Sequence, residues 1–437
     1  MAIQKQGTVA GGSDFDVVLK EYYEGPVREH LNNSIPILKY VEKSKRKWNG
    51  RRVLFPVHLR RNHGVGARGE TGTLPTAGRQ EYVESKINSK FMYGRIELTG
   101  VVIAASQGDK GSFASALRTE VEGLRRDLRV DMNRQVWGNP IADTGGGKLN
   151  TGLLAQVNSE PASTAAQAEV SVTFDNPGTR YLKAGMVLNV GTATGLGTGD
   201  LATGGAKRME VSSITSTTVA VLKNINASGG AAIDIANNEI AVRGDANDNS
   251  FNKEVSGLSF MLSADDDDFQ TVDTGDNPEW AANVLDNSAV NRPLSLELMQ
   301  LAIDTTDEVA GAEPNLIMGH HSIRREYINL LTSDVRYSPE QLRGGFQKLT
   351  YAGGTNPMPI EFDRMAPYNK LFFLNTKDIK MYVMKDWAWA DRDGSTFSRK
   401  LNSDSWEAFM VWYGNMGLER RFSQTLLSDI EVSNLIF

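Results

Sequence analysis

The chain has 437 residues, 40% of them hydrophobic and 23% charged, with a formal net charge of −6. This length is enough for two or three domains with packed cores, and the negative charge argues against a protein that binds nucleic acid over its whole surface. The absence of cysteine excludes disulfides, thiolate metal sites and cysteine nucleophiles. The sequence has no run of about 18 apolar residues that would span a membrane. Residues 1–16 also lack the apolar core of a secretory signal peptide, so we expect neither feature.

The first 50 residues are predicted to form an arm and a helix. Residues 1–12 are small and polar, which favours an extended arm. A helix is expected from Ser13, its cap, to Leu31, because apolar residues recur at helical spacing: Phe15, Val18, Leu19, Tyr22, Tyr23 and Val27. Residues 35–48 then become basic.

Residues 51–104 are predicted to form a long two-stranded hairpin. Val53, Phe55 and Val57 recur at every second position of the first strand, and residues 81–104 are rich in β-branched and aromatic side chains. The connection between them, residues 60–80, has almost no apolar content and is unusually long for a compact domain. We expect a hairpin tip that reaches away from the body. A two-stranded ribbon is marginally stable alone, so we expect it to lie on a neighbouring molecule.

A long amphipathic helix is predicted over residues 112–137. Ser112 is its expected N-cap, and Gly138 is expected to end it. One face is apolar: Phe113, Leu117, Val121, Leu124, Leu128, Met132 and Val136. The opposite face is charged: Arg118, Glu122, Arg125, Arg126, Arg129 and Arg134.

Residues 157–260 have a different composition, rich in Ser, Thr, Gly, Ala and Val. Short β-type runs recur there, separated by turn clusters: 168–174, 185–190, 208–214, 217–222 and 238–244. This spacing predicts a small barrel or sandwich inserted between two helix-containing parts.

The rest of the chain begins with an acidic connector, residues 261–292. A helix is then expected over 295–310, with Ser295 as its cap and with Leu298, Leu301 and Val309 on one face. Residues 314–320 indicate a buried strand, and residues 322–331 a second helix. Strands are expected at 370–376 and 379–384, and residues 406–430 are expected to form one long strand and then a terminal strand near Thr425–Ile430.

This order of elements resembles the major capsid proteins of tailed bacteriophages, which have the α+β HK97-like fold. The resemblance rests on the order and on segments such as PNLIMGHHSIRREYINLL (314–331) and EAFMVWYGNMGLERRF (407–422). It implies seven parts: N-terminal arm and helix 1–50, E-loop hairpin 51–104, spine helix and part of the P-domain 105–156, inserted β domain 157–260, acidic connector returning to the P-domain 261–292, A-domain 293–375, and C-terminal P-domain strands 376–437.

The implied function is a head protein that self-assembles into hexamers and pentamers of an icosahedral shell around double-stranded DNA. Its main partner would be itself, with scaffold, portal and decoration proteins as further partners and packaged DNA contacted non-specifically from inside. The implied location is the virion, assembled in the bacterial cytoplasm, with no membrane partner. Two alternatives stay open: an encapsulin-type compartment shell, and a β-rich ligand- or glycan-binding protein.

Charged residues supply the candidate contact sites between subunits. Basic residues dominate 39–68, where Glu42 is the single acid, and a basic arm binds either a phosphate backbone or an acidic patch of a neighbour. We favour the neighbour, with the acidic stretch 263–279 as its partner. Asp265 to Asp268 are also candidate Ca²⁺ ligands, but a solvated loop fits the pattern better. The intersubunit candidates are Lys45, Arg46, Lys47, Trp48, Arg60, Arg61, Arg68, Glu70, Asp265, Asp266, Asp267 and Asp268.

The sequence contains no recognisable catalytic, cofactor or metal motif, so we do not expect an enzyme. The GxGxxG pattern at Gly64–Gly69 is followed by a proline-containing loop rather than by the helix that a dinucleotide site needs. His320 and His321 are adjacent and therefore a poor metal pair. The aromatic run near the C-terminus fits either sheet core or a sugar platform, and its alternation favours the core: Trp387, Trp389, Phe397, Trp406, Phe409, Trp412 and Tyr413.

Overall fold

The computed structural model describes residues 36–101, 110–138, 151–159, 165–175, 177–198, 206–225, 232, 234–263, 269–332, 350–351, 353–354, 357–390 and 398–432. The expected N-terminal helix and Asp265–Asp268 lie outside these residues. The chain divides into two compact units. The first contains residues 91–132 and 385–413, and the second contains 36–90, 133–384 and the segment that begins at 414.

The first unit combines a long helix with a β-sheet. Helix α3 (Lys110–Trp137) and strand β4 (Lys90–Thr99) enter this unit, and β4 pairs with β18 (Ser405–Leu418). The sheet order is β1-β16-β18-β17, with β16 (Ile379–Trp389), β17 (Ser398–Arg399) and the short β1 (Glu42–Lys43). Strand β1 and the start of β16 belong to the second unit. A Cβ at Gly94 of β4 would lie 2.7 Å from Leu128 Cδ1 of α3. The helix therefore lies directly against this strand, as its apolar face predicted.

The ends of α3 show one wrong prediction and one confirmed prediction. The helix begins at Lys110, so Ser112 lies inside it and is not its cap. It ends at Gly138 as expected, because Gly138 has a φ of 61° and its N–H donates to the Arg134 carbonyl at 2.9 Å. Arg134 itself is buried rather than on a solvated face, and its Nη2 lies 2.6 Å from Glu254 Oε1. The last turn of α3 is buried on all sides, so helical spacing could not separate a charged face there.

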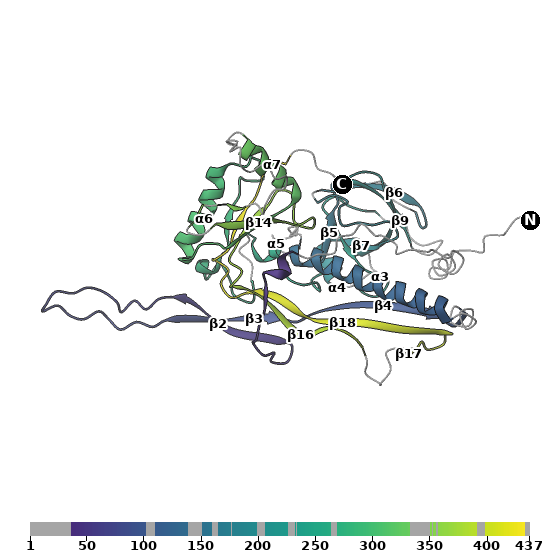
Figure 1. Ribbon diagram of the computed structural model, residues 1–437, viewed down its shortest axis with the longest axis horizontal. Coiled ribbons are helices and arrows are strands. Elements are labelled where there is room, and N and C mark those ends of the chain that lie inside the picture. The colour runs from purple at the N-terminus through teal and green to yellow at the C-terminus, as the bar shows by residue number, and fades with distance from the viewer. Residues whose placement is uncertain are drawn as a thin grey trace, which may run out of the picture. The chain divides into compact units, whose positions relative to one another are not determined.

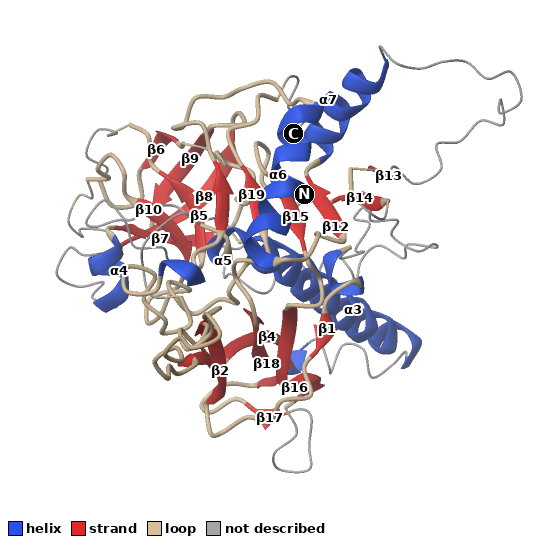
Figure 2. Cartoon of the chain, turned by 90° about the vertical axis from the view of Figure 1, so that its left-hand side faces the viewer, coloured by secondary structure: helices blue, strands red, loops and turns tan. Residues whose placement is uncertain are grey.

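The second unit holds a six-stranded antiparallel sheet in the order β5-β10-β7-β8-β9-β6 (Figures 1 and 2). A bridge between Val157 and Phe174 joins its two outer strands, so the sheet closes into a barrel. Its interior is apolar, with Val172, Leu188 and Met209 fully buried. All five predicted β-type runs are strands, and β5 adds a sixth. The strands are β5 (Leu153–Gln156), β6 (Glu169–Thr173), β7 (Val187–Gly191), β8 (Ala206–Ile214), β9 (Val219–Asn224) and β10 (Ile240–Arg243).

A second sheet of this unit is covered by two helices. Its order is β11-β19-β15-β12-β14-β13. Helices α6 (Leu296–Ala310) and α7 (His321–Thr332) share one hydrophobic core with one face of the sheet, and Trp137 packs against Phe372 on the other face. The strands are β11 (Asn283–Leu285), β12 (Leu316–Gly319), β13 (Thr350–Tyr351), β14 (Met358–Phe362), β15 (Leu371–Leu374) and β19 (Thr425–Leu427). Short helices α4 (Ala193–Thr198), α5 (Leu258–Met261), η1 (Ile37–Lys39) and η2 (Pro278–Trp280) complete the unit.

Helix α6 has the expected ends but not the expected buried face. The Ser295 hydroxyl accepts a hydrogen bond from Leu298 N–H at 3.2 Å, which confirms the cap. Leu301 and Val309 are 48% and 53% exposed, whereas Met299 and Ile303 are buried. Two apolar stripes run along this helix, and only the packing of the sheet decides which one is covered.

Candidate assembly surface

The predicted hairpin is shorter than expected and is held by its own chain at its base. Strands β2 (Arg52–Arg60) and β3 (Glu81–Asn88) form a two-stranded ribbon, while residues 90–99 continue into β4 of the other sheet. Val53 and Phe55 are buried on one face of the ribbon, and Phe55 stacks on Tyr382 with 6.4 Å between ring centroids. The paired part therefore needs no neighbouring molecule to cover its apolar face, contrary to our expectation.

The connection between the two strands, residues 61–80, is largely exposed and extends the ribbon (Figure 1). Val65 and Leu74 are 81% and 82% exposed, which is unusual for apolar side chains. Arg68 donates through Nε to the Thr73 carbonyl at 3.0 Å and shapes the loop from within. Arg61 and Glu70 are exposed. The GxGxxG pattern lies in this loop, as expected, and no helix follows it before β3.

Arg60 closes the base of the loop by contacts within the chain. Its Nε lies 3.0 Å from Glu279 Oε1, and its Nη1 lies 3.3 Å from Glu81 Oε2. Its Nη2 also donates to the Asp276 carbonyl at 3.1 Å. The hydrogen bond from Arg60 lowers the pKa of Glu279. The basic hairpin and the acidic stretch thus meet as charge complementarity suggested, but at Arg60 they meet inside one subunit.

The basic segment that precedes β2 contacts strand β16 and also Glu419, which directly follows β18. Lys380 Nζ lies 2.7 Å from Glu42 Oε2, and Ser44 N–H donates to the Met381 carbonyl at 2.8 Å. Arg46 Nε lies 2.9 Å from Glu419 Oε1, with its guanidinium 5.1 Å from the Phe55 ring centre. Arg46 is therefore engaged within the chain, and Glu419 is a partner that the sequence analysis missed.

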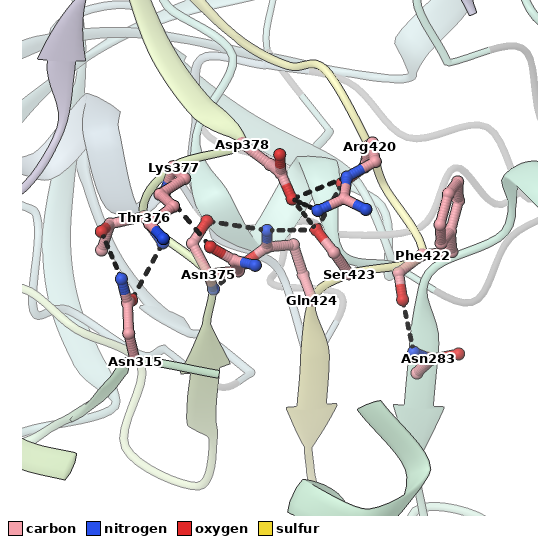
Figure 3. A network of polar contacts seen from close by, with 10 residues as sticks. All are labelled: Asn283, Asn315, Asn375, Thr376, Lys377, Asp378, Arg420, Phe422, Ser423 and Gln424. Carbon is pink, nitrogen blue, oxygen red and sulfur yellow. Dashed lines mark hydrogen bonds and ion pairs between the residues drawn. The ribbon is translucent and has the colours of Figure 1, made fainter. Parts of the chain in front are cut away.

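A polar network fixes the backbone that carries Glu419 (Figure 3). Asp378 accepts hydrogen bonds from Ser423 Oγ at 2.6 Å and from Arg420 Nε at 3.1 Å, and its carbonyl accepts from Glu419 N–H at 2.9 Å. The Gln424 side chain accepts from Asn375 N–H at 2.8 Å and donates to the Asn375 carbonyl at 3.1 Å. The residues of this network are distant in the sequence, so no local motif could have predicted it.

The segment then makes a tight turn at the start of β2. Asn49 and Arg52 exchange backbone hydrogen bonds of 2.8 and 3.2 Å, and Gly50 adopts a φ of 60°. Ser89 N–H donates to the Arg51 carbonyl at 2.9 Å, which ties the turn to the ribbon. Lys45 and Lys47 are exposed just before the turn, and Trp48 is half-buried.

Three cations of this turn have no counter-charge among the residues that the structure describes. Lys47, Arg51 and Arg52 are all exposed, and none of them forms an ion pair there. We call residues 45–52 the basic turn. Of the sequence-predicted candidates, the structure brings Lys45, Lys47 and Trp48 together with Arg51 and Arg52 in this turn. It places Arg60 and Arg61 at the other end of β2.

The histidine pair and the aromatic run have structural roles. His320 Nδ1 accepts a hydrogen bond from Ser322 N–H at 3.1 Å, and burial lowers the pKa of His320 to about 3. No group of three or more metal-binding side chains gathers within the described parts of the chain. Trp412 is buried and lies 6.1 Å from Trp387 between ring centroids, which agrees with a sheet core. Tyr413 lies on the opposite face of β18 and packs edge-to-face against Phe91, with 5.2 Å between the ring centroids.

Comparison with solved structures places the fold. The capsid asymmetric unit of cyanophage A-1(L) matches 95% of this chain and 99% of its own, with a TM-score of 0.54 and 12% identity. The chain has the HK97-like capsid fold. The capsid of an empty GTA particle matches at a TM-score of 0.47, with 7% identity over 98% of this chain and all of the other. The holo-SrpI encapsulin of Synechococcus elongatus matches at 0.40, with 7% identity over 98% of this chain and 99% of the other.

Sequence comparison adds nothing to this likeness. No protein-family model and no curated protein sequence matches the chain. Helix α3 lies in the segment that we expected to be a spine helix, and β2 and β3 lie in the segment that we expected to be an E-loop hairpin. Among the described helices, none has both the length and the apolar character needed to cross a membrane.

Proposed function

We propose that this chain is a major capsid subunit that assembles into hexamers and pentamers of an icosahedral shell around double-stranded DNA. The observation that carries the proposal is the match to a phage capsid subunit over 95% of the chain. The exposed loop 61–80 supports it, because exposed apolar side chains such as Val65 and Leu74 mark surfaces that become covered on association. Binding then comes from interface burial rather than from chemistry at a site.

Several finer features belong to the same proposal. The hairpin and the N-terminal arm reach neighbouring subunits, so each subunit is held by several others. The seven-part division given above, with the barrel as an inserted domain, follows from the same resemblance. Arg61, Arg68 and Glu70 of the loop make ion pairs between subunits. Scaffold, portal and decoration proteins are its further partners, and assembly takes place in the host cytoplasm.

Negative-stain electron microscopy and size-exclusion chromatography of the purified, concentrated protein test this function. We expect closed shells, rings of five or six subunits, or tubes. A variant chain tests the role of the hairpin. It replaces residues 61–80 with an Asn-Gly turn, which removes the exposed loop and keeps the buried pairs of the ribbon. This variant should fold as a monomer and lose assembly. Normal shells from it would contradict the role of the hairpin.

The contents of purified shells separate phage capsid from encapsulin. Packaged DNA supports the capsid, whereas a bound cargo enzyme supports a compartment shell. Saturable binding to a glycan array by a protein that stays monomeric at high concentration would favour the ligand-binding reading instead.

A further inference from the structure

Strand β2 forms an open edge of the ribbon. Among the described residues, β2 and β3 are a two-stranded sheet and pair only with each other. In β3, the Lys86 N–H donates to the Gln270 carbonyl at 2.8 Å and therefore points away from β2. Backbone groups alternate in direction along an antiparallel pair, and Lys86 lies opposite Leu54. The backbone groups of Leu54, Pro56 and His58 therefore also point outward, away from β3.

This outward edge lacks a partner within the described part of the chain, where no backbone group hydrogen-bonds to Leu54, Pro56 or His58 from outside the ribbon. Unpaired groups on a strand edge are a template for a strand of another molecule. The sequence around them, Val-Leu-Phe-Pro-Val-His-Leu (53–59), has no acidic residue, lysine or arginine and is mostly apolar. Uncharged segments rich in valine and phenylalanine pair readily with copies of themselves. A second copy of β2 is therefore the partner that this edge fits best.

Pro56 stands at the centre of the edge and interrupts it. Its side chain is exposed, and its ring nitrogen has no hydrogen to donate to a partner strand. If two copies of β2 pair in antiparallel fashion around this position, Leu54 of each copy faces His58 of the other, and the two prolines face one another. The central pair then forms neither of its hydrogen bonds and leaves both of its carbonyls without a donor.

We propose that Pro56 keeps the edge of β2 from pairing with the β2 edge of a second copy. The ribbon then stays two-stranded, and exposed side chains such as Leu54 and Tyr82, which are 40% and 60% exposed, are left to make its contacts with other molecules. The opposite edge of the ribbon is already covered at Lys86 by Gln270. The inference depends only on the ribbon, so it holds or fails independently of the proposed function.

Pro56→Val tests this role, because valine restores the missing N–H and favours a strand. Analytical ultracentrifugation should show several-fold more self-association than the native chain at the same concentration, with an infrared band of intermolecular β-sheet. Adding Leu54→Lys should reverse the effect, since a lysine on an edge strand opposes pairing. A Pro56→Val chain that associates no more than the native chain would overturn the proposal.

Cysteine pairing tests whether the β2 edges are the surfaces that meet. The chain has no cysteine, so Leu54→Cys and His58→Cys each introduce one defined thiol. The Cα atoms of such an edge pair lie about 5.5 Å apart, within reach of a disulfide. After mild oxidation of the two mixed chains, peptide mass spectrometry should find the 54–58 link several-fold more often in the Pro56→Val background than with Pro56 retained. Equal yields would contradict the proposal, and so would association without this link, because another surface would then be responsible.

The fold of the variants is checked separately. Thermal unfolding of Pro56→Val should show a cooperative transition close to that of the native chain. If this variant does not fold, Pro56→Thr takes its place in both experiments, because threonine restores the same N–H with a polar side chain. A folded Pro56→Thr chain without increased association would then overturn the proposal.

Discussion

At the scale of single residues, burial decides what a charge does in this fold. The side chains of Arg134 and Glu254 are each 9% exposed, and their pair ties the end of α3 to the segment after the barrel. The Arg46 and Glu419 side chains, by contrast, are 45% and 28% exposed. A buried pair that loses one partner leaves an unneutralised charge in a poorly solvated site, whereas water and salt screen an exposed pair.

We expect Arg134→Met to lower the free energy of unfolding by about 3 kcal/mol, because the buried Glu254 carboxylate loses its ion pair with Arg134. The matched variant Arg46→Met should cost less than about 1 kcal/mol. Urea unfolding of both variants, followed by tryptophan fluorescence, measures the difference. Equal losses would show that the Arg134 pair is not the buried connection described here.

His320 should make the fold sensitive to acid. Burial first, and then the nearby Arg180, His321 and Arg325, lower the pKa of His320 to about 3, and its Nδ1 already accepts from Ser322 N–H. Between the ordinary histidine value and pH 3 the unfolded chain binds a proton that the folded chain does not. Stability therefore falls as the pH falls through this window, by up to about 1.4 kcal/mol per unit from this group.

We expect His320→Asn to flatten this dependence, because its Oδ1 can accept the same Ser322 hydrogen bond and does not titrate. Unfolding free energies at about pH 7, above the window, and at about pH 5.5 and 4.5, within it, measure the slope. His63→Asn, in the exposed hairpin loop, is the control and should leave the slope unchanged. An unaltered slope in His320→Asn would assign the acid sensitivity to other groups.

At the scale of elements, the contact of α3 with β4 depends on one missing side chain. A Cβ at Gly94 would lie 2.7 Å from Leu128 Cδ1 and 2.8 Å from Leu124 Cδ1, closer than side-chain atoms normally approach. Gly94 thus lets the long helix lie flat on the strand. A glycine at this position serves close packing rather than a turn, which is one of its uses in strands.

Gly94→Val should destabilise the protein by about 1–3 kcal/mol, since the added atoms push α3 away from β4. Thermal unfolding measures the loss. Adding Leu128→Ala to Gly94→Val should recover part of it by making space, and Gly69→Ala, where nothing lies within 4 Å, should be neutral. If the double variant were less stable than the sum of its single changes, the steric explanation would fail.

At the scale of the whole molecule, loop 61–80 is the feature whose surroundings should change most on assembly. Arg61, Arg68 and Arg79 are exposed, so trypsin should cut the unassembled chain there. In purified shells these sites should be protected while the exposed Lys183 of the barrel stays cleavable. Mass spectrometry of timed digests gives both rates. Equal cleavage of the loop in monomers and shells would argue against its burial by a neighbour.

Several patterns of local origin were read correctly from the sequence, although Ser112 was wrongly expected to cap α3. The spacing of Leu124, Leu128 and Met132 predicted α3, the Ser295 side chain predicted the start of α6, and alternating short runs predicted the barrel strands. Each of these signals depends only on residues a few positions apart, whose side chains follow the repeat of the helix or strand. Such a pattern can be read directly from the sequence. The order of such elements was enough to suggest the HK97-like fold, which the cyanophage capsid match supports.

The tertiary structure alone decided which charges and faces are free. Arg46, Arg51, Arg52 and Arg60 all belong to the basic stretch 39–68. Among the described residues, however, only Arg46 and Arg60 form ion pairs, with Glu419 and Glu279. The face of α6 with Leu301 and Val309 matches a core pattern but remains exposed. Pairing and burial depend on residues hundreds of positions apart in the chain, such as Arg46 and Glu419. A sequence specifies these contacts only through the complete fold. Helical spacing and charge runs therefore identify candidate core faces and candidate ion-pair residues, and the packing decides which of them are buried or paired.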